Sequence, residues 1–597
     1  MIKEFINKIV NLIKSKDYKN ALIEIENYSE SFYPHNNNPL LLYYLAFIKY
    51  RLNEKKEALE ILNLLIKKNP DFIEAQHLSS NINVDLKKKD VSKEILESFS
   101  DKTPNNQKAS YNLGRLNQQH LKNKGKIVLF FPHSGHEINN WMPFPYLYLA
   151  PFLEKAGYTV SIVDSRVEKN WQKTLTNDLK DAFALGVTSM SGPDLIPAIE
   201  ASQIARGMNK KISIMWGGHH ASALPDEIFN ENLGDYVFLG PAEFTFPKIL
   251  DCIYHKKEIP SDIKGVVWQE KGEIVGNRLS NSAVFDYEET PAYHLIDVEE
   301  YRSSNNVVSY FKTRGCPFKC TFCATGNFNV SHKLPRQYHK EIKMLIEGFK
   351  FSNFVFRDPT FFLKASTVMD CAELLNSFEH VKWKGQARGT FHRQYTPEQF
   401  RYMRKSGLTS VMFGVESGSQ RMLDIMDKRV TREDYVKSAE VLNDLGVEMY
   451  ASFMFAMPRE TVADLRDTIS LMHELKKINP NILLQNCIFL PLPDTNMFKD
   501  AIELGYQPPT NLKSWSERGI TSRFEERDDI TWMKKDVLKE YIKVYNEEFG
   551  VYKHAYQKEA EGEYVNPMNE KVDKTIIIQS DKPTLDKDEW DIGIKVS

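Results

Sequence analysis

The sequence predicts a multidomain α/β chain with an N-terminal α-helical repeat, a doubly wound Rossmann-like domain, a partial (β/α)6 barrel and a small mixed C-terminal region. Three observations support this. The chain has 597 residues, which is too long for one hydrophobic core. In residues 1–100 the apolar residues recur with the period of an α-helix, and almost no segment has the pattern of a strand. Two later stretches alternate short β-branched runs with helical segments.

The composition narrows the possible functions. A net charge of -2 provides no overall basic field, so we expect no nucleic-acid partner. Charged residues interrupt the N-terminal segment, and no apolar run is long enough to predict a membrane span. The chain has only six cysteines, far fewer than a secreted disulfide scaffold. We therefore expect a cytoplasmic protein with reduced thiols.

Residues 1–100 are expected to form a helical repeat. A polar break at 53–56 separates two periodic runs, and Ala46, Ala58 and Pro70 recur at intervals of 12 residues. Small residues let paired helices approach closely, and Pro70 would end the second helix. The pattern resembles a tetratricopeptide repeat, with a generic helical hairpin as the alternative. Such a region is a possible docking site for a protein partner. The polar stretch 87–124 reads as a linker.

Residues 124–262 contain five short apolar runs separated by helical segments, which predicts a doubly wound parallel sheet. Ligands of such sheets lie outside the carboxyl ends of the strands. No G-x-G-x-x-G follows the first run, which disfavours a dinucleotide. The loops expected at the ligand edge are 132–136, 189–192, 217–222 and 240–243.

Residues 263–301 read as a linker, and residues 302–505 show a second, longer alternation. Six apolar runs joined mostly by helical spacers predict an open or partial barrel, with its active site at the C-terminal ends of the strands. Residues 506–597 form a mixed and charged C-terminal region. Its last 40 residues are polar enough for partial disorder to be expected.

Half of the cysteines lie in "TRGCPFKCTFCATG", residues 313–326, directly after the first expected barrel strand. Cys316, Cys320 and Cys323 have the spacing C-x3-C-x2-C. Three thiolates on a tight loop suit an iron–sulfur cluster, whereas structural zinc sites complete four ligands with a different spacing. Three thiolates on a four-iron cube leave one iron open to bind and activate a ligand. We expect these cysteines to be the metal ligands at a catalytic centre.

The stretch "CPFKCTFC" resembles the signature of the radical S-adenosylmethionine (SAM) superfamily. This resemblance implies a [4Fe–4S] cluster on the three cysteines and SAM on the open iron. It also implies an electron donor, such as flavodoxin or ferredoxin, for the cleavage of SAM to methionine and a 5'-deoxyadenosyl radical. The remaining Cys252, Cys371 and Cys487 lie in apolar contexts and read as structural thiols.

Three further stretches resemble strand-end motifs of the same superfamily. "VMFGVESGS" resembles the fourth, "MFAMPRET" the fifth and "FLPLPDTNMF" the sixth, although Ala456, Arg459 and Asp494 replace glycines. Asp358, at the second strand end, is a candidate for orienting substrate. The resemblance implies these SAM contacts, with Phe322 at the adenine: Phe322, Gln386, Arg388, Glu416 and Pro458.

The domain upstream of the barrel resembles the cobalamin-binding domain found before many radical SAM cores. The resemblance lies in "PFPYLYLAPFLEKAGYTVSIVD", "GVTSMSG", "WGGHHAS" and "LGPAEFTF". The D-x-H-x-x-G sequence that supplies an axial histidine in some cobalamin enzymes is absent, and a packing role is the alternative for His220. The implied cobalamin contacts are Ser189, Ser191, Gly217, Gly218, His220, Gly240 and Glu243.

Together the two cofactors imply methyl transfer to an unactivated carbon or phosphorus of a small-molecule or carrier-bound biosynthetic intermediate. One SAM would methylate cobalamin, and a second would supply the radical that removes a substrate hydrogen. A cobalamin-dependent radical cyclase, like the magnesium-protoporphyrin ester cyclase of chlorophyll synthesis, is the first alternative. A methylthiotransferase acting on transfer RNA is disfavoured, because only Cys252 lies upstream for a second cluster. A non-catalytic repeat scaffold or cobalamin-responsive regulator is the alternative from another class.

Overall fold

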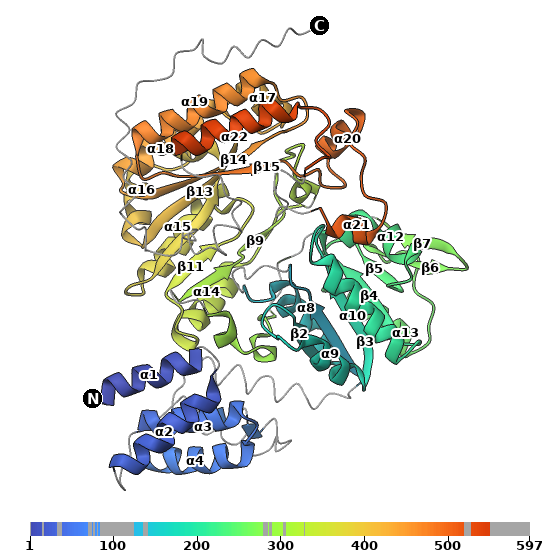
Figure 1. The fold of residues 1–597 in the computed structure, drawn as a ribbon, viewed down its shortest axis with the longest axis vertical. Helices are drawn as coiled ribbons and strands as arrows, with labels where there is room; N and C mark the ends of the chain where they lie inside the picture. The colour runs from blue at the N-terminus through green and yellow to red at the C-terminus, as the bar shows by residue number, and fades with distance from the viewer. Residues whose placement is uncertain are drawn as a thin grey trace.

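The computed structural model shows a helical region, two sheet domains and a C-terminal extension (Figure 1). The described residues are 2–14, 17–32, 39–69, 75, 78–79, 82–83, 124–134, 141–278, 285, 289–302, 306–327, 329–518 and 527–549. Pro70, nearly all of the expected linker at 87–124 and the tail beyond residue 549 lie outside this description. The predicted mixed α/β fold is confirmed.

The N-terminal region is helical, as predicted. Its helices are α1 (Ile2–Lys14), α2 (Tyr18–Phe32), α3 (Pro39–Arg51) and α4 (Lys55–Lys68). Ala46 and Ala58 are fully buried in the core that α3 and α4 share, where small side chains permit close packing. Arg51 forms ion pairs with Asp297 at 2.7 Å and with Glu300 at 2.5 Å. The repeat is thereby attached to the short helix η2 (Val298–Tyr301), which precedes the barrel.

The first sheet is doubly wound, as predicted, and has the strand order β2-β1-β3-β4-β5-β6-β7. Its parallel strands are β1 (Lys126–Phe131), β2 (Thr159–Asp164), β3 (Ala182–Thr188), β4 (Ser213–Gly217) and β5 (Tyr236–Phe238). Its helices are α8 (Phe144–Lys155), α9 (Trp171–Leu179), α10 (Leu195–Met208), α11 (Gly218–Ala223), α12 (Pro225–Asn230) and α13 (Phe246–Tyr254). Successive residues of β1 point to opposite faces, so Phe130 packs near α9 while Leu129 packs with α8 and α13.

The segment expected to be a linker, 263–301, begins with two strands of this sheet. β6 (Val266–Glu270) and β7 (Glu273–Asn277) form an antiparallel hairpin that extends the sheet beyond β5. Only Val266 and Val267 of this hairpin are buried, and polar residues surround Gly272 at its turn. Two buried residues give too short an apolar run to distinguish an edge hairpin from a linker in the sequence.

The second sheet has six parallel strands that lie in sequence order, which confirms the partial (β/α)6 barrel. The strands are β8 (Val307–Tyr310), β11 (Asn353–Phe356), β12 (Lys382–Ala387), β13 (Leu408–Glu416), β14 (Glu448–Phe455) and β15 (Leu483–Ile488). The helices around it are α14 (Pro335–Lys343), α15 (Ala365–Asn376), α16 (Pro397–Lys405), α17 (Gln420–Ile425), α18 (Arg432–Asp444) and α19 (Val462–Ile478). α22 (Lys535–Phe549) packs beside α19 (Figure 1). A separate hairpin of β9 (Thr313–Arg314) and β10 (Ser331–His332) carries the three-cysteine loop.

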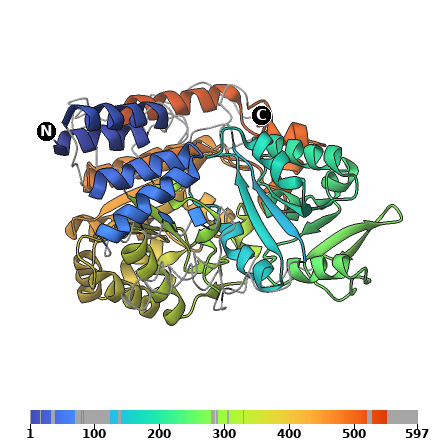
Figure 2. The same cartoon turned by 90° about the horizontal axis from the view of Figure 1, so that it is seen from below.

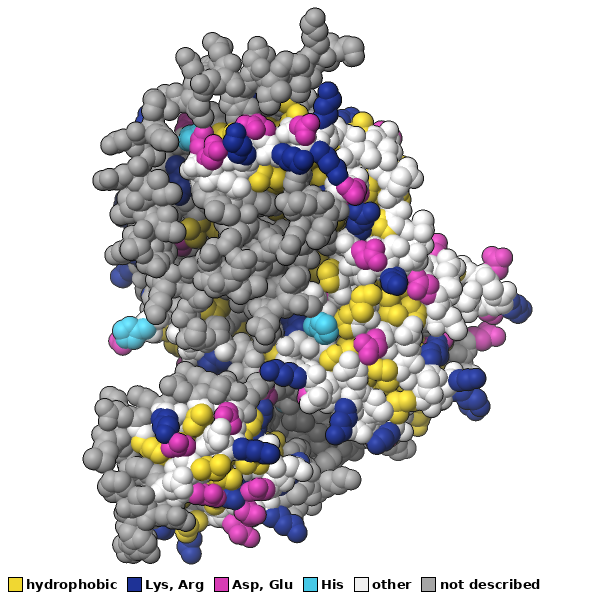
Figure 3. Space-filling model, viewed as in Figure 1, with side chains coloured by type: hydrophobic (Ala, Val, Ile, Leu, Met, Phe, Trp, Pro, Cys, Tyr) yellow, Lys and Arg dark blue, Asp and Glu magenta, His cyan; other side chains and the backbone are white. Residues whose placement is uncertain are grey.

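The chain returns to the first sheet after the barrel. It passes through α20 (Asn496–Glu503) to α21 (Leu512–Ser516), which lies against α12. The two sheets form neighbouring lobes, and the N-terminal helices lie on the barrel side (Figure 2). Basic and acidic side chains are interspersed over the described surface of the face in Figure 3. The returning C-terminal segment therefore connects the barrel lobe to the first sheet a second time.

Candidate active site

The three-cysteine loop is held in shape by backbone contacts. Cys316, Cys320 and Cys323 are free thiols and are partly exposed. The N–H of Thr321 donates to the Met426 carbonyl at 3.0 Å, and the N–H of Met497 donates to the Thr321 carbonyl at 2.9 Å. The loop is therefore anchored to the segment after β13 and to the start of α20.

Asp358 was expected to orient substrate, but in the structure its side chain does not face the site. Its side chain is completely buried, and both carboxylate oxygens accept the Lys312 N–H at 3.2 Å. Burial raises its pKa, and the neighbouring Lys312 opposes that shift. Asp358 thus fixes the backbone between β8 and the cysteine loop and is closed to a substrate. A polar residue at a strand end gives no sign of which way its side chain turns.

Arg388 lies directly against the cysteine loop. Its Nη1 is 3.8 Å from Cys320 Sγ, and its guanidinium carbon lies 3.5 Å from the centre of the Phe318 ring. Its buried Nη2 has no hydrogen-bond partner among the described residues. Gln386 lies two positions earlier on β12 and so points to the same side. An orphaned guanidinium donor beside a thiol suits a carboxylate ligand such as that of SAM.

Glu416 ends β13 with a left-handed backbone, at φ 68°. Its Oε1 is 3.4 Å from Lys428 Nζ, which also donates to the Gly414 carbonyl at 2.5 Å and lies 5.8 Å from the Phe322 ring centre. Burial opposes the Lys428 charge, but Tyr435, Glu416 and Cys320 outweigh it, and the pKa is raised. Lys428 thus joins two predicted SAM contacts. Sequence reasoning missed it because a lysine in "MDKRVTRED" reads as exposed.

The three residues that replace motif glycines keep glycine-like backbone angles. Ala456, Arg459 and Asp494 have φ of 61°, 67° and 63°. Pro458 is buried between the first two, so the turn after β14 retains its left-handed conformations. Glu460, the next residue, is also buried, and its Oε2 accepts the Met457 N–H at 3.1 Å. Burial raises the pKa of Glu460 to about 8.

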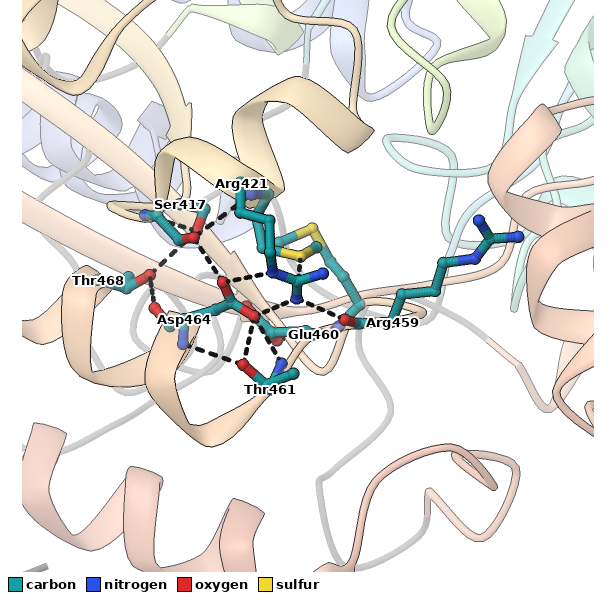
Figure 4. Close-up of polar contacts among 10 residues, drawn as sticks. Ser417, Arg421, Arg459, Glu460, Thr461, Asp464 and Thr468 are labelled. Atoms are coloured by element: carbon teal, nitrogen blue, oxygen red, sulfur yellow. Dashed lines mark hydrogen bonds and ion pairs between the residues drawn. The ribbon is translucent and has the colours of Figure 1, made fainter.

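A polar network joins the ends of β13 and β14 (Figure 4). Ser417 Oγ lies 3.1 Å from Thr468 Oγ1, and Arg421 Nη2 donates to the Arg459 carbonyl at 2.7 Å. Asp464 accepts from Arg421, from Ser419 Oγ at 2.5 Å and from the Thr461 N–H at 2.8 Å. Burial opposes the Asp464 charge, but these donors outweigh it and lower its pKa to about 2. The network therefore fixes the two loops that carry Glu416 and Pro458.

The carboxyl edge of the first sheet has room for a ligand. Gly218 has φ 91°, and a Cβ there would lie 2.3 Å from the Ser189 carbonyl. At Gly217 the nearest atom to an added Cβ is 4.0 Å away. Ser189 is buried, and its Oγ has no partner among the described residues. An unpartnered hydroxyl beside an open glycine fits the close approach of a polar ligand group.

His220 is a packing residue in this structure. Its ring is completely buried, with Nδ1 2.9 Å from Ser191 Oγ and its ring centre 5.6 Å from that of Trp515. It therefore fixes the loop of Ser191 rather than opening toward a cofactor. Gly240, at φ 89°, donates its N–H to Ser222 Oγ at 3.2 Å, which shapes the loop before Glu243.

Three exposed apolar side chains lie on segments that follow strands of this sheet, and sequence reasoning missed them. Trp141, Met190 and Phe244 follow β1, β3 and β5 and are 41%, 57% and 46% exposed. Large exposed apolar groups at a ligand edge indicate a surface that a flat apolar partner covers. Each stands alone in the sequence, so only the meeting of the strand ends reveals the group.

Glu243 reaches from this edge to the cysteine loop. Its Oε1 lies 2.5 Å from Nη1 of Arg314, two residues before Cys316. The described residues contain no group of three His, Cys, Asp or Glu side chains around a single ion. A [4Fe–4S] cluster does not need one, because separate irons take separate thiolates. The donor types on the loop fit the cluster, and the open sheet edge fits cobalamin.

Comparison with known proteins assigns both lobes. Residues 310–472 match the radical SAM superfamily, residues 139–250 the B12 binding domain, and residues 41–109 the Fis1 C-terminal tetratricopeptide repeat. An uncharacterized methyltransferase of Pyrococcus horikoshii is 25% identical over 394 residues, covering 63% of this chain and 83% of the relative. An anaerobic magnesium-protoporphyrin IX monomethyl ester cyclase of Rubrivivax gelatinosus is 26% identical over 402 residues, covering 63% and 70%.

A solved structure has the same fold. The radical SAM methyltransferase TsrM from Kitasatospora setae, with cobalamin and a [4Fe–4S] cluster bound, aligns with a TM-score of 0.52 at 15% identity. The alignment covers 64% of this chain and 76% of TsrM. At this identity the likeness shows the fold alone.

The fold and the site thus define a chain that sets a three-cysteine loop beside a cobalamin-type sheet. The chain contains a radical SAM domain at residues 310–472, a B12-binding domain at residues 139–250 and a tetratricopeptide-like region. The radical SAM domain implies a [4Fe–4S] cluster and SAM, and the B12-binding domain implies cobalamin. No helix among the described residues is long and apolar enough to cross a membrane.

Proposed function

We propose that this enzyme transfers a methyl group from SAM, through cobalamin, to an unactivated carbon or phosphorus of a biosynthetic intermediate. One observation carries the proposal. Arg314, two residues before Cys316, is paired with Glu243 on the loop after β5. The cysteine loop and the cobalamin edge therefore adjoin, and a substrate can reach both centres from one position.

The chain's own residues bind and orient the reactants. Cys316, Cys320 and Cys323 hold the cluster, and the free Nη2 of Arg388 receives the SAM carboxylate, with Gln386 beside it. Glu416, held by Lys428, binds the ribose or amino group, and Phe322 meets the adenine. Pro458 shapes the turn on the adenine side. These contacts fix SAM before reaction, when alignment lowers the barrier most.

The cobalamin edge is assigned in the same way. Ser189 and Ser191 bond the polar tail, while Gly217, Gly218 and Gly240 allow close backbone approach. Trp141, Met190 and Phe244 cover the apolar ring system and exclude water from the reaction space. When bound, cluster and SAM supply a radical that removes a substrate hydrogen, and cobalamin supplies the methyl group.

The expected products follow from the two uses of SAM. Methyl donation converts one SAM to S-adenosylhomocysteine, and one-electron cleavage of another gives methionine and, after hydrogen removal, 5'-deoxyadenosine. The electron comes from a small redox protein of the flavodoxin or ferredoxin class. The tetratricopeptide-like region is a docking site for a protein partner or a substrate carrier, because no residue within it suggests chemistry of its own.

A radical cyclase is the second candidate, since the cyclase relative is as similar to this chain as the methyltransferase relative. The two functions differ in their products. A cyclase yields 5'-deoxyadenosine without S-adenosylhomocysteine, whereas a methyltransferase yields both.

The test is anaerobic reconstitution with iron, sulfide and cobalamin, followed by mass spectrometry of the SAM products. We expect both products from the wild type and neither 5'-deoxyadenosine nor a full cluster from Cys320→Ala. Cys252→Ala, which removes a thiol from α13, is the matched control and should behave as the wild type. A Cys320→Ala protein that still cleaves SAM reductively contradicts the proposal.

A further inference from the structure

We propose that Arg314 is a positioning residue that sets the cysteine loop at a fixed place relative to the cobalamin-binding domain, acting through Glu243 and two aromatic rings. This inference rests on the proposed function, because it concerns the separation of the two cofactors. Arg314 belongs to neither set of predicted cofactor contacts, and Glu243 was expected to contact cobalamin itself.

The first anchor is the ion pair. Arg314 Nη1 lies 2.5 Å from Glu243 Oε1, and the Glu243 side chain is only 6% exposed. The Arg314 guanidinium carbon is 4.3 Å from the Phe285 ring centre and 5.3 Å from that of Tyr148. Tyr148 belongs to α8 and Glu243 to the loop after β5, so two elements of the cobalamin-binding domain hold one side chain of the cysteine hairpin.

The second anchor is Lys333, which follows the other strand of that hairpin. Its side chain is completely buried, and Nζ donates to Tyr148 at 3.0 Å and to Tyr310 at 3.3 Å. It also forms an ion pair with the buried Glu341. Both strands of the hairpin therefore end in a cation that reaches Tyr148 of the cobalamin-binding domain.

An ion pair with a buried carboxylate suits positioning better than an apolar contact does, and here Glu243 is buried while Arg314 is 20% exposed. Buried charges are costly without a partner, so removal of either group leaves the other uncompensated and favours loop movement. The planar fork of an arginine also restricts direction as well as distance. Two-centre chemistry on a single substrate requires such a restriction, because small displacements of reacting groups slow a reaction strongly.

The pair also places opposite charges near the cluster. Arg314 lies two residues from a cluster ligand, and its positive charge favours the reduced, more negative cluster. Glu243 opposes that effect. Loss of each group alone should therefore shift the cluster potential in opposite directions, which a purely structural role does not predict.

The experiment uses the full-length protein loaded with cluster and cobalamin. Both the reduced cluster and cob(II)alamin are paramagnetic, so electron paramagnetic resonance measures their magnetic interaction and, in a redox titration, the cluster potential. We expect Arg314→Gln and Glu243→Gln to alter that interaction. Arg314→Lys, which keeps the positive charge, should alter it less than Arg314→Gln does. Arg314→Gln should lower the cluster potential, and Glu243→Gln should raise it.

Asp297→Asn is the matched control, because it removes an ion-pair partner of Arg51 at the contact between the helical repeat and η2 and touches neither Arg314 nor Glu243. It should change neither reading. An unchanged interaction in both Gln variants, at full cofactor occupancy, overturns the inference, and so do potential shifts of the same sign.

Hydrogen exchange of the cofactor-free proteins provides an independent measurement. Both Gln variants should speed exchange in the cysteine loop and in the loop after β5. Unchanged exchange there overturns the inference even where a variant loses its cofactors. A wild type that binds no cobalamin refutes the proposed function instead, while the exchange result still tests the ion pair.

Discussion

Gly217 and Gly218 are neighbours in the sequence, but their backbones impose different demands. Gly218 adopts φ 91°, a backbone angle that residues other than glycine rarely adopt, and an added Cβ would meet the Ser189 carbonyl. Gly217 has extended backbone, and an added Cβ would meet no atom closer than 4.0 Å. One glycine therefore serves the fold, and the other leaves space at the ligand edge.

This difference predicts two distinct outcomes. Gly218→Ala should lower the stability of the domain by about 2–4 kcal/mol, through backbone strain and overpacking. Gly217→Ala should change the melting temperature little and weaken cobalamin retention. Thermal denaturation of the cofactor-free proteins, together with the absorbance of bound cobalamin, separates the two effects. Equal melting temperatures for both variants would show that the Gly218 turn tolerates a side chain.

At the scale of elements, three barrel helices begin with a capping motif that is visible in the sequence. Helices α16, α18 and α19 each start with a capping box in which Thr396, Thr431 or Thr461 pairs with the residue three positions on. At α19 the box does more than begin the helix. Its Asp464 also accepts from Ser419 and Arg421, so the helix start holds the loop after β13 in place.

Replacement of Asp464 should show this in its pH dependence. Its folded pKa of about 2 lies below the ordinary 3.8, so its stabilisation is present above about pH 4 and is lost as the pH falls toward 2. Asp464→Asn should cost about 2 kcal/mol at pH 7, and the difference from the wild type should shrink in acid. Urea unfolding measured across this pH range is the test.

Asp467→Asn is the control for this prediction, since Asp467 is exposed on the same helix. It should alter stability by no more than about 0.5 kcal/mol. A stability difference for Asp464→Asn that stays constant down to pH 2 would show that the carboxylate charge is not what stabilises the loop.

At the scale of the whole molecule, the C-terminal segment after the barrel packs back onto the cobalamin-binding domain. Trp515 of α21 is 2% exposed, donates from Nε1 to Glu227 at 3.0 Å and packs edge-to-face on His220. The N–H of Leu512 donates to Glu231 at 2.8 Å. The segment after the barrel therefore packs against α11 and α12 of the cobalamin-binding domain and supports them.

Trp515→Ala should cost about 3–5 kcal/mol, as the removal of a buried indole usually does. It should also increase hydrogen exchange in α11 and α12 and reduce cobalamin retention. Trp515→Phe keeps a ring but leaves Glu227 without its donor, and we expect a smaller loss of about 1–3 kcal/mol. Equal exchange in the wild type and Trp515→Ala would show that α21 is not needed to support these helices.

The order of the two sheets and the place of the cysteine loop could be predicted because their signals are local. Alternating apolar runs record strand and helix periods within a few residues, and Cys316, Cys320 and Cys323 lie on one loop. The hairpin of β6 and β7 was missed because its apolar run is short. The direction of Asp358 could not be predicted, and the choice between a packing and a cofactor role for His220 stayed open, since burial depends on which elements pack over a side chain.

The sequence by itself therefore determined the parallel strands of the two sheets, the helical N-terminal region and the three thiols of the cysteine loop. Only the tertiary structure decided that Glu243 would meet Arg314, that Lys428 would join Glu416 to Phe322, and that Trp515 would cover His220. The physical reason is that period and spacing are properties of adjacent residues. The partner of a charge or a ring is set by how separate elements pack.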